Sequence, residues 1–324
     1  MIGWYVHHHG RGHAHRAAVV VAALTGVEVT GLSSGPAPAG WAGPWVDLPP
    51  DTGPGPDATA GGVLHWAPLT PGYRGRAAVL AAWVASARPQ LVVVDASVEV
   101  TLLLRLLGVP VVVVAAPGDR LDRPHRAAYD AATALLAPWP AWVQPAGWPP
   151  DWTTKTCAVG ALSRADARAR PEVVAGTVAV LLGAGGDDLT PGRLAAARRD
   201  TPGWTWTVLG GDTGWVADPW PVLASAQVVV THAGQNALAE VAAARRPAVV
   251  LPQVRPHDEQ ATTGRVLADA DLAEVRPTWP SDWPELLERA ATRDGQRWTR
   301  WNDGLGAQRA ADVVRGVLAT CAPR

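Results

Sequence analysis

The stretch of this chain that most restricts its fold runs from residue 227 to residue 260. An apolar segment at 227–231 has the length and composition of a buried strand, and a second one follows at 247–251. Between them lie a polar turn, His232-Ala233-Gly234, and a segment at 235–245 whose apolar residues recur at helical spacing. The pattern predicts a strand, a helix and a second, parallel strand.

The turn at Gly234 is suited to bind an anion. A helix that begins there points its unpaired backbone N–H groups and the positive end of its dipole toward the turn, which favours phosphate. Asn236 and Glu240 share one face of this helix. A polar segment at 257–260 follows the next strand, and loops that follow parallel strands meet over one crevice.

Strands and helices alternate in the same way along the rest of the chain. A charged segment at 163–176 has helical character and is where we expect the hinge between two domains. The predicted fold class is therefore α/β, with doubly wound parallel sheets. The further strands are expected at 2–7, 27–32, 91–95, 109–115, 134–137, 177–182, 204–209 and 274–275, and the further helices at 14–24, 76–87, 99–107, 123–133, 189–200, 283–293 and 306–320.

The stretch 227–260 resembles the nucleotide-binding half of GT-B glycosyltransferases, and most of all the bacterial peptidoglycan N-acetylglucosaminyltransferases of the family 28 type. The resemblance implies a GT-B fold with two Rossmann-like domains facing a central cleft. It implies an acceptor domain at 1–165 and a nucleotide-sugar donor domain at 166–324, whose terminal helix can return to the first domain.

The same resemblance implies roles for residues of the second domain. Glu240 would hold the ribose hydroxyls, and the turn Gly234-Gln235-Asn236 would hold the diphosphate. The sugar hydroxyls would fall to Glu259 and Gln260, where the family usually has two glutamines.

A glycine loop, Gly10-Arg11-Gly12-His13, stands between the first predicted strand and helix. Its glycines allow the backbone to approach a substrate, and His13 falls at a helix N-terminus, which disfavours the imidazolium form. A neutral histidine can act as general base on an acceptor hydroxyl. The loop also resembles the Gly-His loop of the same transferase family, which favours this role over simple helix capping. Asp95, at the end of a predicted strand, is a candidate to orient His13 or an acceptor.

Further candidates accompany these two loops. The glycine loop at 183–186 follows a predicted strand, so backbone N–H groups near Gly183 and Gly185 could reach the diphosphate. His232 could donate to a phosphate oxygen or simply pack within its turn. Arg16, on the first helix, is expected to be solvated or to face phosphate.

We expect no metal site. His7, His8 and His9 are consecutive on an extended segment, so their side chains alternate in direction and seldom chelate one ion together. Asp269 and Asp271 fit a turn better than a metal-binding motif.

Composition excludes several classes of function. The chain has 324 residues and a formal net charge of −1, so no strong field favours nucleic acid or an acidic membrane surface. It has 17 Trp and no Phe, a bias that a GC-rich, actinobacterial-like genome explains better than function does. Cys157 and Cys321 are expected to be reduced thiols. Because there is no signal-peptide pattern and no apolar run of membrane-spanning length, we expect a cytoplasmic protein.

These observations favour a metal-independent, inverting glycosyltransferase that moves a sugar from a UDP- or TDP-linked donor to an acceptor hydroxyl. The donor is a substrate, so no cofactor is expected. The acceptor is a small or lipid-linked molecule, and membrane contact is not indicated. Trp41, Trp45 and Trp66 suit an apolar or stacked acceptor.

Two alternatives keep the same nucleotide site. A nucleotide-sugar hydrolase would use His13 to activate water, and the glycine loop followed by an arginine resembles such hydrolases. A non-catalytic auxiliary protein would bind the nucleotide sugar without turnover.

Overall fold

A computed structural model describes residues 1–52, 55, 57–183, 189–211 and 216–321. The chain forms two compact units, each with a parallel sheet. The first unit contains Met1–Ala116, Arg120–Val159 and Ala307–Arg324, and the second contains Pro117–Asp119 and Gly160–Gly306. The main boundary thus lies between residues 159 and 160, whereas the sequence analysis placed it between 165 and 166.

The sheet of the first unit has seven parallel strands in the order β3-β2-β1-β4-β5-β6-β7. Its inner strands are apolar because helices cover both faces, and every residue of β4 (Val92–Asp95) and β5 (Val111–Val114) is buried. The other strands are β1 (Ile2–Tyr5), β2 (Val29–Ser33), β3 (Trp45–Asp47), β6 (Ala134–Ala137) and β7 (Thr156–Ala158). The helices are α1 (Gly12–Ala23), η1 (Ala60–Gly62), α2 (Pro71–Ala87), α3 (Val98–Leu106), α4 (Arg123–Ala131), α5 (Pro150–Lys155) and α11 (Gly306–Cys321).

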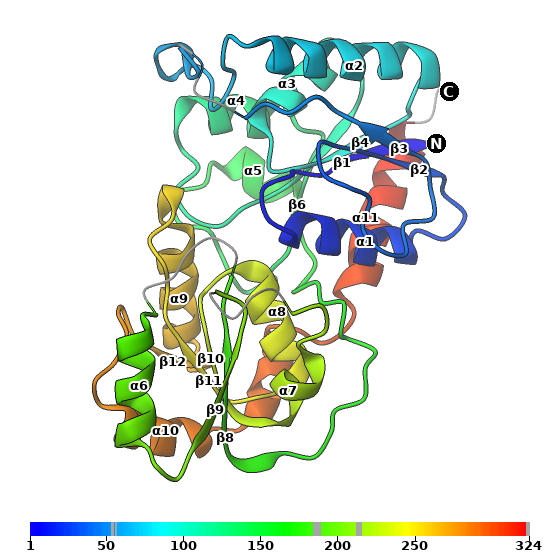
Figure 1. Cartoon of the computed structure of the whole chain (residues 1–324). Helices are drawn as coiled ribbons and strands as arrows, with labels where there is room; N and C mark the ends of the chain where they lie inside the picture. The colour runs from blue at the N-terminus through cyan, green and yellow to red at the C-terminus, as the bar shows by residue number, and fades with distance from the viewer. Residues whose placement is uncertain (53–54, 56, 184–188, 212–215, 322–324) are drawn as a thin grey trace. The chain divides into compact units, whose positions relative to one another are not determined.

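The second unit has five parallel strands in the order β12-β11-β10-β8-β9. One face of this sheet packs on α6 (Pro191–Asp200) and α10 (Trp283–Ala291), where Trp206, Trp283 and Leu286 belong to one buried cluster. In Figure 1, α7 and α8 lie on the opposite side of these strands from α6. The strands are β8 (Val174–Leu181), β9 (Thr205–Leu209), β10 (Ala226–Thr231), β11 (Ala248–Val250) and β12 (Glu274–Val275). The other helices are α7 (Trp220–Ser225), α8 (Gln235–Ala244), η3 (Pro256–Asp258), α9 (Glu259–Asp269) and η4 (Gly295–Arg300).

Hydroxyl caps and prolines determine where several helices begin. Thr70 accepts a hydrogen bond from the backbone N–H of Tyr73 at 3.2 Å, and Pro71 follows it at the start of α2. Thr190 and Pro191 repeat this arrangement at α6, where Thr190 accepts from the N–H of Arg193 at 3.2 Å.

Both strand orders contain a switch point, where the chain reverses its direction of travel across the sheet. In the first unit β2 and β3 lie on one side of β1, and β4 to β7 lie on the other. In the second unit β9 lies on one side of β8, and β10 to β12 lie on the other. Loops that leave the carboxyl ends of the two central strands diverge there, which opens a crevice for ligands.

The structure corrects the prediction of a helix at 163–176. Residues 163–173 form turns and irregular backbone, and 174–176 begin β8. The reason is local: the Ser163 hydroxyl accepts from the N–H of Ala165 at 3.0 Å, and the Asp166 carboxylate accepts from the N–H of Ser163 at 3.4 Å. These side chains offer the backbone an alternative to helical bonds.

The sequence analysis also missed some short elements, β3, α5 and α7, which lie in segments rich in tryptophan and proline. It treated residues 257–260 as a loop, whereas α9 begins at Glu259. Among the helices of the described residues, none combines the length and the apolar character needed to cross a bilayer.

Candidate functional site

His13 and Asp95 meet at the switch point of the first unit. Asp95 is the last residue of β4, and His13 lies in the first turn of α1, which follows β1. Because β1 and β4 are neighbours in the sheet, their carboxyl ends bring the two side chains together. The Nδ1 atom of His13 lies 2.9 Å from Oδ1 of Asp95.

Arg16 holds the same carboxylate. Its Nε donates to Oδ2 of Asp95 at 3.1 Å and its terminal nitrogen donates to Oδ1 at 2.7 Å. Asp95 is fully buried. Burial by itself would raise the pKa of this carboxyl, but the Arg16 guanidinium and His13 hold the pKa well below its usual range.

An ionised Asp95 can only accept hydrogen bonds, so its contact with His13 assigns the proton to Nδ1. The lone pair of His13 then lies on Nε2, which is the arrangement of a general base oriented by a carboxylate. The turn that follows Asp95 is strained, because Ala96 adopts a φ of 63°. Gly10, in the loop before α1, has a φ of 74°, a left-handed conformation that glycine adopts without steric cost.

The three consecutive histidines lie beside this pair. The rings of His7 and His8 stack with centroids 5.1 Å apart, and the His7 ring lies 5.4 Å from that of His13. Stacking places ring faces against one another, and it does not direct ring nitrogens to a common point. Burial, followed by the neighbouring imidazoles, lowers the pKa of His7 to about 3.

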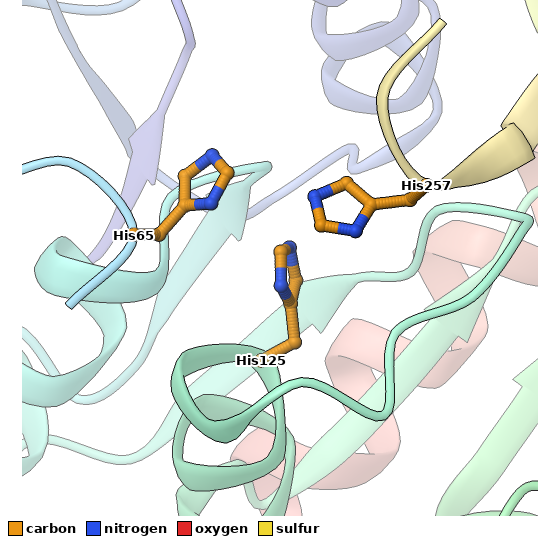
Figure 2. Close-up of side chains that lie close together, drawn as sticks. All are labelled: His65, His125 and His257. Carbon is orange, nitrogen blue, oxygen red and sulfur yellow. The ribbon is translucent and has the colours of Figure 1, made fainter. Parts of the chain in front are cut away.

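Two further histidines of the first unit lie close together, as Figure 2 shows. The rings of His65 and His125 are 5.0 Å apart and nearly perpendicular. His125 is buried, and its Nδ1 lies 2.7 Å from a carboxylate oxygen of Asp122. His257, the third residue labelled in Figure 2, belongs to the second unit, where its backbone oxygen accepts from the N–H of Asp119 at 2.8 Å. The sequence analysis singled out neither His65 nor His125.

His232 occupies the switch point of the second unit. It follows β10, and the loop that begins at Gly183 follows β8. A side chain on Gly183 would place its Cβ 2.7 Å from Nε2 of His232, and one on Gly234 would place its Cβ 2.5 Å from Cε1. Both distances are too short for a real Cβ, so the imidazole of His232 can keep this position only while residues 183 and 234 have no side chain.

Hydrogen bonds define the tautomer of His232. The N–H of Gly234 donates to Nδ1 at 3.0 Å, so Nδ1 carries no proton. Burial and the nearby Arg255 guanidinium lower the pKa of His232 to about 4, while a side-chain hydrogen bond with Gln260 opposes this shift. The ring is therefore neutral near pH 7, with its proton on Nε2, which makes it a donor of the kind that an anionic oxygen accepts.

The side chain of Gln260 links two loops by hydrogen bonds. It is buried, and its Oε1 accepts from the N–H of Ala233 and from the N–H of Gln253, each at 3.0 Å. This oxygen therefore holds the protein backbone, and a role of Gln260 toward sugar hydroxyls stays a prediction. Glu259 is the first residue of α9, and its sugar role likewise stays a prediction.

Glu240 is paired with an arginine that the sequence analysis did not consider. Arg164 donates from Nε to Oε1 of Glu240 at 2.8 Å. Burial raises the pKa of the Glu240 carboxyl, and Arg164 offsets part of that shift. Glu240 and Asn236 both lie on α8, whose first residue is Gln235. Backbone N–H groups in the first turn of a helix have no acceptor within the helix.

A pocket lies beside His232 within the second unit. It holds about 440 Å³ when its open mouth is included. Its walls are mostly apolar and come from the carboxyl ends of β8, β10 and β11 together with the segment after β12. The residues that line it include Leu182, Leu189, His232, Gln253 and Trp279. Gly185, which was predicted to bind phosphate with Gly183, lies outside the described residues.

Arg16 is the residue of this site that sequence reasoning misjudged. We expected it to be solvated or to face phosphate, but it is 5% exposed and bonded to Asp95. Its position three residues after His13 places both on one face of α1, a spacing that could have indicated a shared partner.

No protein-family model and no curated protein sequence matches this chain. Solved structures do match it. The glycosyltransferase of kitacinnamycin aligns over 98% of this chain and 98% of its own, with a TM-score of 0.72 at 18% identity. MurG of Acinetobacter baumannii aligns over 97% of this chain and 99% of its own, with a TM-score of 0.61 at 16% identity.

A third structure that matches is the Streptomyces glycosyltransferase SsfS6 in complex with thymidine diphosphate, with 98% of this chain and 99% of that chain covered, a TM-score of 0.61 and 16% identity. Together with the two parallel sheets, these likenesses show that the chain has the GT-B fold, as the sequence predicted.

Proposed function

We propose that this protein is an inverting, metal-independent glycosyltransferase that transfers a sugar from a UDP- or TDP-sugar to an acceptor hydroxyl. The observation that carries the proposal is the His13–Asp95 pair at the β1/β4 switch point of a GT-B fold. The fold supports glycosyl transfer because two of the three structures compared above, that of the kitacinnamycin enzyme and that of SsfS6, are glycosyltransferases by name. The neutral His232 at the second switch point supports an anionic donor.

In the proposed reaction, the acceptor oxygen attacks the anomeric carbon of the sugar from the side opposite to the nucleotide. The acceptor proton passes to Nε2 of His13, and Asp95 stabilises the imidazolium that forms. The bond between the anomeric carbon and the phosphate oxygen breaks, and its electron pair leaves with the nucleoside diphosphate. One displacement of this kind inverts the anomeric configuration.

The leaving diphosphate gains negative charge, which hydrogen-bond donors of the second unit would stabilise. The proton on Nε2 of His232 and the first-turn N–H groups of α8 are donors that need no rearrangement when that charge develops. Glu240 is our candidate for the ribose hydroxyls, with Arg164 fixing its carboxylate. Thymidine diphosphate bound to SsfS6 supports TDP as one of the nucleotides to test.

Calorimetric titration with UDP, TDP, GDP and ADP tests the donor site. We expect one of these diphosphates to bind, and Glu240→Ala to weaken its binding by about 1–3 kcal/mol, as for a buried hydrogen-bond partner that is removed. Glu288→Ala, an exposed carboxylate on α10, is the matched control and should change nothing. Equal binding by Glu240→Ala and the unaltered protein would contradict the assignment of Glu240.

Product analysis separates the transferase from the hydrolase. The protein is incubated with a UDP- or TDP-sugar, with and without a hydroxyl-bearing acceptor and with a chelator throughout. The transferase proposal expects a glycoside of inverted anomeric configuration by NMR, in the presence of the chelator and only with acceptor. Release of free sugar at the same rate without acceptor would instead establish the hydrolase.

A further inference from the structure

A loop of the first unit, residues 57–70, exposes large apolar side chains. Val63 is 39% exposed, Trp66 is 41% exposed and Leu69 is 71% exposed. The sequence had marked Trp41, Trp45 and Trp66 as suited to an apolar acceptor. The rings of Trp41 and Trp45 contact each other edge to face at 5.1 Å, so of these three tryptophans Trp66 is the one that offers a large exposed surface.

This loop is held in place in spite of its exposure. Oε1 of Glu99 accepts from the backbone N–H groups of His65 and Trp66, at 2.6 and 2.9 Å. The indole N–H of Trp66 donates to the backbone oxygen of Asp51 at 3.1 Å. A side chain on Gly55 would place its Cβ 2.6 Å from Pro68, so the neighbouring segment packs closely on the loop. Trp66 is therefore an ordered aromatic surface, which binds a ligand with little loss of conformational entropy.

The loop lies at the same edge of the sheet as the His13–Asp95 pair. Glu99 stands in the first turn of α3, which follows Asp95 directly after a short turn. A second series of contacts joins the loop to this pair through Asp51, which accepts the Trp66 indole N–H and whose carboxylate lies 3.2 Å from Nε2 of His8. The His8 ring stacks on His7, and the His7 ring lies 5.4 Å from that of His13. Ligands of open parallel sheets bind outside this edge.

We propose that Trp66, with Val63 and Leu69, is the binding surface for a flat, apolar acceptor whose reacting group is a phenolic or similar ring hydroxyl. The indole face stacks on the ring of the acceptor, and the aliphatic side chains cover its edge. This inference rests on the proposed function, because it takes the hydroxyl toward His13 to be the nucleophile of the transfer reaction.

A membrane surface is the other partner that an exposed apolar loop can have. The charges of this loop do not favour it: from Asp57 to Thr70 the sequence contains an aspartate and no lysine or arginine. Loops and helices that dock on anionic lipid usually combine apolar side chains with several cationic ones. A small aromatic molecule needs no such charges.

The test measures the binding of 4-methylumbelliferone, 1-naphthol and quercetin to the full-length protein by saturation-transfer NMR and calorimetry. We expect at least one of these planar phenols to bind, and Trp66→Ala to weaken its binding about tenfold or more, as expected when a stacking partner is lost. Trp66→Phe keeps a ring face without the indole N–H and should lose less than about threefold.

The matched control is Leu106→Ala, which removes another exposed apolar side chain, 86% exposed, from the last turn of α3. It should leave phenol binding unchanged. Glu99→Ala removes the bonds that hold the loop and should weaken phenol binding although Trp66 is still present. Circular dichroism and thermal unfolding confirm that each variant is folded.

Three results would overturn the inference. One is that none of the three phenols binds to the unaltered protein. Another is that Trp66→Ala binds them as well as the unaltered protein does, or that Trp66→Phe is as weak as Trp66→Ala. The third is that phosphatidylglycerol vesicles bind the protein in a Trp66-dependent way while the phenols do not.

Nucleotide titrations on the same variants separate this inference from the proposed function. We expect the diphosphate affinity to be equal in all of them. Trp66-dependent phenol binding without any nucleotide binding would refute the transferase and keep the aromatic site. Nucleotide binding and His13-dependent turnover with unchanged phenol affinity in Trp66→Ala would refute the aromatic site and keep the transferase.

Discussion

The two units place their candidate sites at the same topological position and fill that position with different chemistry. In the first unit the switch point holds a buried carboxylate, that of Asp95, which contacts the guanidinium of Arg16 and the imidazole of His13. In the second unit it holds the uncharged His232 between two glycines. The comparison teaches that the doubly wound sheet decides where a ligand can bind, while a few loop residues decide what happens there.

The difference also separates two roles for histidine. His13 contacts a carboxylate, so it can take up a proton and stay balanced by Asp95. His232 is buried near Arg255, which disfavours a second positive charge on the ring. Under the proposed function, His13 changes its charge during the reaction and His232 remains a fixed donor.

The largest expected effect comes from removing the proton acceptor. His13→Ala should lower the rate of transfer by about 10²–10⁴, the usual contribution of a general base, and leave the affinity for the nucleoside diphosphate unchanged. His9→Ala, an exposed neighbour, is the control and should keep nearly the full rate. Initial rates and calorimetry on both variants check this. Full activity in His13→Ala would mean that the first switch point is not a base site.

The next effect concerns the glycine that contacts His232. Gly183→Ala would place a Cβ 2.7 Å from Nε2 of His232, so the imidazole must shift, and such overpacking costs about 1–3 kcal/mol of folding stability. Because the displaced imidazole could no longer donate to the diphosphate as proposed, we expect weaker nucleotide binding. Gly192→Ala, in α6, is the control, because the nearest atom to its Cβ would be 4.0 Å away. Calorimetric titration of both variants with the preferred diphosphate makes the comparison. Equal affinities would separate Gly183 from the nucleotide site.

Acid should weaken each unit through partly buried histidines, among them His7 in the first unit and His232 in the second. The pKa of His7 is lowered from 6.5 to about 3, and that of His232 from 6.5 to about 4. As pH falls below 6.5, the unfolded chain takes up these protons while the folded chain does not, so stability declines until the folded pKa is reached. At pH 5.5 the loss is about 1.4 kcal/mol for each histidine relative to pH 7.5.

Calorimetric melting of the unaltered protein, His7→Gln and His232→Gln at the two pH values measures this loss. Each variant should show a smaller decline between pH 7.5 and pH 5.5 than the unaltered protein. An equal loss of stability between pH 7.5 and pH 5.5 in all three proteins would show that neither histidine has a lowered pKa in the folded state.

The smallest effect sharpens the role of Arg16. Its guanidinium lies 3.1 Å from Nδ1 of His13 and pairs with Asp95, so it opposes a positive charge on the imidazole. Arg16→Gln removes the charged donors to the buried Asp95 carboxylate, which orients His13, so we expect the rate of transfer to fall by about tenfold or less, as for the loss of a charge-assisted hydrogen bond. Arg16→Lys keeps the charge and should lose less of the rate. Equal initial rates in the Gln and Lys variants would limit Arg16 to a packing role.

Much of the fold could be predicted from the sequence because its strands are long apolar runs. Segments such as 91–95 and 109–115 differ from the observed β4 and β5 by at most two residues at either end, since apolar runs rich in valine have few other structures open to them. The helical assignment of 163–176 failed because charged residues there form turns and ion pairs, and composition alone does not distinguish those from a solvated helix face.

The parts of the candidate site that could be predicted are those in which a residue's position within a single helix or strand shows where its side chain lies. His13 at the start of a helix and Asp95 at the end of a strand follow from local pattern, and their neighbouring strands explain why they meet. The pairing of Arg164 with Glu240 joins residues 76 positions apart in the chain, and no local pattern indicates it. The same holds for Gln260, whose oxygen bonds to two separate loops.

The sequence by itself determined the order of the longer strands and helices in this protein, because an apolar run or a helical periodicity is visible in neighbouring residues. Only the tertiary structure decided which polar atoms are engaged. Hydrogen bonds form only when donor and acceptor lie about 3 Å apart, and which side chains come that close depends on how distant segments pack. That is why Arg16 became the partner of Asp95, and why His232 came to lie between Gly183 and Gly234.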